Sequence, residues 1–142
     1  MTLLLDAGAF VPVERGDRDV VALVKRERLS QRSPLSHGGV VAEIWRSGPN
    51  RQAEVARLLG GVEVVALGEE LRKKAGVLLG LSGGDDAVDA ALICLARDGD
   101  DILTSTPETS ELWRRQRVYM WNWCPCDGAV EVGVAASAFI SR

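Results

Sequence analysis

Short apolar runs with the character of β-strands alternate with longer stretches of helical periodicity along residues 3–104. The first run, Leu3–Leu5, stops at a charged residue, and residues 62–67 are rich in valine and alternate in polarity. Alternating strands and helices are typical of α/β proteins, in which helices cover both faces of a mostly parallel sheet. We therefore expect a three-layer α/β/α sandwich with a central, mostly parallel sheet. The expected strands are 3–5, 34–36, 62–67 and 102–104, and the expected helices are 7–14, 17–29, 40–46, 51–59, 68–79 and one from 85 or 86 to about 97.

The chain length and composition indicate one globular domain over residues 1–142. Hydrophobic residues make up 46% and charged residues 26%, which favours a folded protein over a disordered one. No run approaches the roughly 18 apolar residues of a membrane helix, and the start has no basic leader, so we expect a cytoplasmic protein without a membrane partner. The net charge of −3 argues against a protein that coats nucleic acid, so any such site must be a local basic patch.

Three acidic residues occupy positions where carboxylates can meet. Asp6 directly follows the first strand, Glu43 lies within an expected helix, and Asp89 interrupts a nearly unbroken apolar helix, where a charge needs a partner. Ligands of open α/β sheets bind outside the carboxyl ends of the strands, and crowded carboxylates need a cation such as Mg²⁺ or Mn²⁺. A metal there can activate water for attack on a phosphate. For any one acid alone, a solvated surface or a helix cap is the common alternative.

Four segments occur in the order and with the spacing of one known family: residues 4–9 (LLDAGA), 41–46 (VAEIWR), 86–91 (DAVDAA) and 102–105 (ILTS). Over about residues 2–106 the chain resembles PIN-domain ribonucleases, and most of all the VapC toxins of bacterial toxin–antitoxin pairs. The resemblance implies a PIN-like fold and a Mg²⁺- or Mn²⁺-dependent endoribonuclease in which Asp6, Glu43 and Asp89 are the catalytic, metal-binding acids. It also implies a homodimer, an RNA substrate such as a tRNA or rRNA loop, and neutralisation by a cognate antitoxin protein.

The same resemblance suggests roles for further residues. Ser105 would add an oxygen near the metal or orient a water molecule, and Asp86 would support the metal ligands or merely cap its helix. Arg46 and Arg51 would contact the RNA backbone, although a solvated helix face is a common position for such arginines. His37 matches no family role and is expected to be structural.

The chain departs from the family pattern at Thr106, where toxins of this type usually have a fourth acid. From there the character changes, and residues 106–142 form an atypical segment. We consider a frameshift, because in the reading frame that starts one nucleotide earlier the codons from Met120 to Cys124 must encode Val-Glu-Leu-Val, an alternating strand. Sequencing the coding DNA tests this hypothesis.

Two other functions are compatible with the sequence. A catalytically impaired PIN domain, lacking the fourth acid, would act only as an antitoxin-binding protein. A phosphoryl-receiving domain of the response-regulator kind would also use an acidic pocket, but it needs a lysine at the end of a late strand. Lys25, Lys73 and Lys74 all lie in expected helices, which argues against this third reading.

Overall fold

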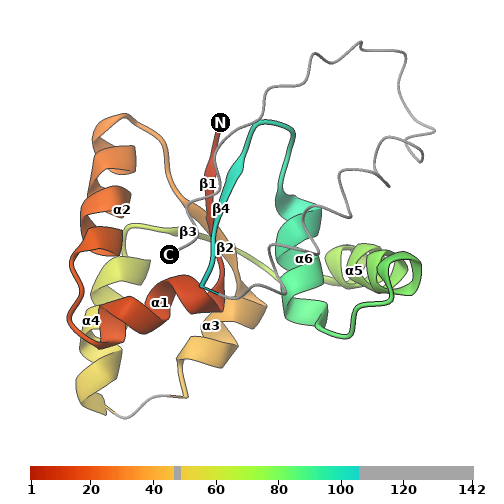
Figure 1. Cartoon of the computed structure of the whole chain (residues 1–142), viewed down its shortest axis with the longest axis horizontal. Coiled ribbons are helices and arrows are strands. Elements are labelled where there is room, and N and C mark those ends of the chain that lie inside the picture. Colours follow the sequence, from red (N-terminus) through yellow and green to blue (C-terminus); the bar gives the residue numbers. More distant parts are fainter. Residues whose placement is uncertain (47–48, 106–142) are drawn as a thin grey trace.

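The computed structural model describes residues 1–46 and 49–105 of the 142, except for the side chains of residues 49–51. The described part alternates helices with short strands (Figure 1). The strands are β1 (Leu3–Leu5), β2 (Leu35–His37), β3 (Glu63–Val65) and β4 (Asp101–Leu103). The helices are α1 (Ala7–Glu14), α2 (Asp19–Leu29), α3 (Gly38–Ile44), α4 (Pro49–Leu59), α5 (Glu69–Ser82) and α6 (Ala87–Leu95).

The four strands form one parallel sheet in the order β3-β2-β1-β4. Strand β1 lies between β2 and β4, with Leu4 opposite both Leu35 and Ile102. Because parallel strands need crossover connections, helices link each strand to the next. The sequence prediction of a mostly parallel sheet in an α/β fold is therefore confirmed.

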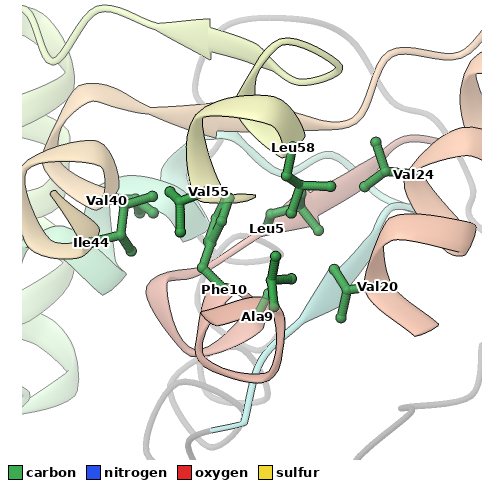
Figure 2. Close-up of a cluster of buried hydrophobic side chains, with 10 residues drawn as sticks. Leu5, Ala9, Phe10, Val20, Val24, Val40, Ile44, Val55 and Leu58 are labelled. Atoms are coloured by element: carbon green, nitrogen blue, oxygen red, sulfur yellow. The ribbon is translucent and has the colours of Figure 1, made fainter. Parts of the chain in front are cut away.

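Helices cover both faces of the sheet, which gives the three layers expected from the sequence (Figure 1). Successive strand residues point to opposite faces, so Leu4 and Leu5 of β1 enter different cores. Leu4 joins a cluster with α5 and α6, whereas Leu5 joins a cluster with α1–α4. Figure 2 shows Leu5, Phe10 and Leu58 of this second cluster together. The sheet is thus buried on both sides, and its carboxyl edge lies where α1, α3 and α6 begin.

Several boundaries differ from the expected ones for local reasons. Helix α3 begins at Gly38 rather than at residue 40, because the His37 side chain accepts a hydrogen bond from the Gly39 N–H and caps the helix. Helix α5 continues to Ser82, where Gly83 adopts a left-handed conformation with φ of 72° and ends it. Strand β3 is three residues long instead of six because it pairs only with β2, and Val64 on it is 43% exposed.

The expectations for the C-terminal part of the chain concern residues that the structure does not describe. The atypical segment 106–142 lies outside the described residues. The frameshift hypothesis and the missing acid at Thr106 both concern this segment. Within the described part of the chain, no helix is long and apolar enough to cross a membrane.

Candidate acidic site at the carboxyl edge of the sheet

The carboxyl ends of β1 and β4 meet at the point where the order of strand addition reverses. The chain moves outward from β1 to β2 and β3, and it then returns to place β4 on the other side of β1. Leu5 lies opposite Leu103, so the next residues along the two strands, Asp6 and Thr104, stand side by side. In open α/β sheets, this kind of switch point is where ligands bind.

Asp6 is a buried carboxylate held by two hydrogen bonds. Its side chain is the cap of α1, where one carboxylate oxygen accepts the Gly8 N–H, and the other oxygen accepts the hydroxyl of Thr104. Only 2% of the residue is exposed. The fold therefore fixes the position and orientation of this carboxylate at the end of β1.

Ser105 packs directly on the start of α1. A Cβ atom added at Gly8 would lie 2.5 Å from the Ser105 hydroxyl oxygen and 2.9 Å from its backbone nitrogen. Only glycine leaves room for this approach, because real Cβ atoms do not come so close to other atoms. Ser105 is exposed and stands next to Thr104, so its hydroxyl lies at the same edge as the Asp6 carboxylate.

Helix α6 begins with two more acids, one at its cap and one in its first turn. Asp86 caps the helix, with one carboxylate oxygen accepting the N–H groups of Val88 at 2.8 Å and Asp89 at 3.0 Å. The capping role weighed for Asp86 is therefore present, and a further role near a metal stays a prediction. Asp89 lies half-buried in the first turn of α6, where the positive end of the helix dipole favours an acid.

Glu43 of α3 faces the same negative region. Burial raises the pKa of its carboxyl group, and the charges of Asp86 and Asp6 raise this pKa further. The Arg46 guanidinium opposes these effects and lowers the pKa of Glu43, and its Nε donates to the Glu43 carbonyl oxygen at 3.1 Å. Asp6 and Asp86 are thus each within electrostatic reach of Glu43.

His37 also belongs to this region, although the sequence indicated only a structural role. It is fully buried, its Nδ1 accepts the Gly39 N–H at 3.0 Å, and its Nε2 lies 2.9 Å from the Val88 carbonyl oxygen. Burial lowers the pKa of the imidazole and outweighs the hydrogen bond to Val88, which raises it. The one sequence signal was its position between a strand and a pair of glycines.

The donor set suits a hard divalent cation in chemistry and charge. Oxygen, the ligand that Mg²⁺ and Mn²⁺ prefer, is offered by the side chains of Asp6, Glu43, Asp86, Asp89, Thr104 and Ser105. Burial, and then the charges of Asp86 and Asp6, disfavour the charged form of Glu43, and a bound cation would offset both effects. Among residues 1–46 and 49–105, no group of three or more His, Cys, Asp or Glu side chains is already close enough to hold a metal ion.

Of the two arginines expected to contact RNA, the structure describes the side chain of Arg46 but not that of Arg51. Arg46 is exposed beside Glu43 at the end of α3. The side chain of Arg51, at the start of α4, lies outside the described residues. Comparison with known proteins gives no match to a family model and none to a curated protein.

The raised pKa of Glu43 has a consequence for stability. Between its ordinary value of 4.5 and the raised pKa, the folded chain holds more protons than the unfolded chain. The free energy of unfolding therefore falls as the pH rises through this window and stays lower above it. In EDTA, Glu43→Gln should be more stable than the wild type at neutral pH, by less than about 1 kcal/mol because water screens a half-exposed carboxylate.

Urea unfolding from about pH 4 to pH 8 measures this difference. The advantage of Glu43→Gln should shrink toward the acidic end, because the wild-type carboxyl group is protonated there. Glu63→Gln, which changes an exposed glutamate on the edge strand β3, is the matched control and should show no such trend. A constant difference between wild type and Glu43→Gln at every pH would contradict the raised pKa of Glu43.

Proposed function

We propose that this chain is a metal-dependent endoribonuclease of the PIN type, similar to VapC toxins, which cleaves phosphodiester bonds in single-stranded regions of RNA with Mg²⁺ or Mn²⁺. The observation that supports it most is the buried Asp6 carboxylate at the switch point of the sheet, with Glu43 and Asp86 close enough to feel one another's charge. Acids gathered at the carboxyl edge suit a cation and a phosphate better than they suit an apolar ligand.

In this function, Asp6, Glu43 and Asp89 would hold the cation. The cation supplies an activated water molecule and neutralises the charge that develops on the phosphate. Thr104 keeps the Asp6 carboxylate in one orientation through its hydroxyl, which limits the reorganisation needed at the site.

The raised pKa of Glu43 belongs to the metal-free chain, and a bound cation would lower it by stabilising the carboxylate. Arg46 would contact the RNA backbone beside it, since its guanidinium is exposed and forked donors match phosphate oxygens.

The experiment that tests the proposal is an RNA cleavage assay with a labelled single-stranded substrate. We expect cleavage with Mg²⁺ or Mn²⁺ and none in EDTA. The companion variant Thr106→Asp, at a position outside the described residues, supplies the acid that the family pattern has there. Cleavage by this variant alone would favour the impaired-domain alternative, and equal cleavage with and without EDTA would exclude a metal-dependent mechanism.

A second candidate, the antitoxin-binding domain without activity, is favoured by a separate surface. An open groove of about 740 Å³ lies between α2 and α4. Its apolar floor includes Val21, Val24 and Leu58, and its lining includes Arg18 and Lys25.

Arg28 and Arg57 add positive charge to the groove, while Asp17 and Glu54 add negative charge, so the lining is basic on balance. An apolar floor with a basic rim suits the acidic amphipathic helix of a partner protein. We propose such a helix of the antitoxin as its occupant. This candidate needs none of the carboxylates at the sheet edge, so a wild-type chain that binds an antitoxin and cleaves no RNA with Mg²⁺ or Mn²⁺ would favour it over the nuclease.

A further inference from the structure

His37 is a buried titratable group that the proposed chemistry does not use. It is the only histidine of the chain and lies at the junction of β2 and α3. None of its surface is exposed, so it contacts neither solvent nor substrate. A buried imidazole needs hydrogen-bond partners, and the identity of those partners defines what the ring does.

The two ring nitrogens have different roles. Nδ1 accepts the Gly39 N–H at 3.0 Å, so in the neutral ring the proton is on Nε2. Nε2 therefore donates to the Val88 carbonyl oxygen, 2.9 Å away. The low-dielectric surroundings keep the ring neutral, because burial lowers its pKa. The imidazole is thus a fixed bridge with one end on the backbone of α3 and the other on the backbone of α6.

The glycine next to the ring makes the bridge tight. A Cβ atom added at Gly39 would lie 2.8 Å from Cε1 and 3.0 Å from Nδ1 of His37. At Gly38 the nearest atom to such a Cβ is the Leu67 backbone nitrogen at 3.8 Å, which is an ordinary contact. The ring therefore lies against Gly39, and a side chain at this position would press on it.

The bridge connects the two helices, α3 and α6, that carry the proposed metal ligands Glu43 and Asp89. Val88 lies directly before Asp89 in the first turn of α6, and α3 carries Glu43 about 9 Å along its axis from His37. The charge of Asp86, the cap of α6, also raises the pKa of Glu43, after the larger effect of burial. The imidazole spans the space between the start of α3 and the first turn of α6, and it therefore fixes their separation at that point.

We propose that His37 is a positioning residue, whose imidazole ties the end of β2 and the start of α3 to the first turn of α6 and thereby sets the spacing of the Glu43 and Asp89 carboxylates. This inference rests on the proposed function, because the spacing matters for activity only if the two carboxylates share a cation. His37 acts through the backbone of Gly39 and Val88 and touches no reacting atom. Groups that orient ligands in this way typically change metal affinity by about 10-fold to 100-fold when they are removed.

The substitution His37→Asn separates the two ends of the bridge. Asparagine is among the best helix caps, so its oxygen can still accept the Gly39 N–H. Its side chain is shorter than imidazole and cannot also reach Val88. We expect Mn²⁺ affinity, measured by isothermal titration calorimetry, to fall by about 10-fold to 100-fold. Affinity for single-stranded RNA in EDTA should not change, which a general loss of structure would not allow.

A pair of glycine substitutions gives the same test without altering the imidazole. Gly39→Ala should displace the ring and weaken Mn²⁺ binding as His37→Asn does. Gly38→Ala changes the same helical turn by the same atoms and should bind Mn²⁺ like the wild type. Thermal unfolding in EDTA establishes that each variant is folded, and if His37→Asn is not, Gly39→Ala decides the question.

The outcomes distinguish the inference from the proposed function. If the wild type binds Mn²⁺ and the bridge variants bind it equally well, the positioning role is wrong and the nuclease proposal stands. If the wild type binds no Mn²⁺, the proposed function falls, and the positioning role falls with it. Weaker binding in His37→Asn and Gly39→Ala, with Gly38→Ala unchanged, supports both.

Discussion

Replacing Asp6 with asparagine should reduce RNA cleavage by roughly a hundredfold to a thousandfold, the range seen when one preorganised electrostatic contact to a transition state is removed. The exchange keeps the size and shape of the side chain and removes its charge. The asparagine oxygen can still accept the Gly8 N–H, and its amide can donate to the Thr104 hydroxyl oxygen with the direction of that bond reversed. The loss should therefore come from the missing charge.

Single-turnover cleavage with saturating Mg²⁺ measures this loss, and thermal unfolding in EDTA measures the fold. We expect Asp6→Asn to be at least as stable as the wild type in EDTA, since one of the charges that raise the pKa of Glu43 is gone. The matched control is Asp85→Asn, an exposed acid just before α6 that has no part in the proposed site. Cleavage by Asp6→Asn at the rate of the control would exclude Asp6 from the chemistry.

The fold could be predicted from the sequence because its signals are local. A parallel sheet between helices follows from apolar runs such as Leu3–Leu5, which carry no polar face, separated by helical periodicity. The placement of Asp6 at the carboxyl edge follows from the same pattern, since an acid directly after a buried strand has no other place to lie. Strand order is not local: nothing in the residues of β4 indicates that it pairs with β1.

The arrangement of the site could be predicted only in part, because it depends on distances between helices. Asp6, Glu43 and Asp89 were identified as candidates from the residues and the family resemblance. The acid whose charge raises the pKa of Glu43 most is instead Asp86, which a sequence reading treats equally well as a helix cap. His37 was assigned a structural role because no motif contains it. Its bridge to Val88 spans 51 residues of sequence, which no local pattern encodes.

Removing the phenyl ring of Phe10 should cost about 3–5 kcal/mol of folding free energy. Phe10 is fully buried, and it packs from α1 into the cluster that contains Leu5 of the sheet and Val55 and Leu58 of α4 (Figure 2). Phe10→Ala therefore loses the transfer free energy of a large side chain and leaves a cavity at the centre of one helical layer. The free energy of unfolding of a domain of this size is about 5–15 kcal/mol in all. The variant should therefore be close to unfolding at physiological temperature.

The control for this change is Val11→Ala, the next residue on the same helix, whose side chain is 41% exposed. Its cost should stay within about 0.5 kcal/mol, as for most surface substitutions. Urea unfolding compares the two variants through their midpoints at constant slope. A loss below about 1 kcal/mol for Phe10→Ala would contradict the packing of α1 on α4, because a well-filled core site cannot lose that much volume cheaply.

The Phe10 variant also tests how the core and the site are connected. Helix α1 begins directly after Asp6, and its first amide groups hold the Asp6 carboxylate in place. A helix that no longer packs on α4 holds its own first turn less firmly, so the carboxylate loses part of its orientation. We therefore expect Phe10→Ala to bind Mn²⁺ more weakly than Val11→Ala even at low temperature, where both are folded. Equal affinities would mean that the strand end alone, through Thr104 on β4, is enough to fix Asp6.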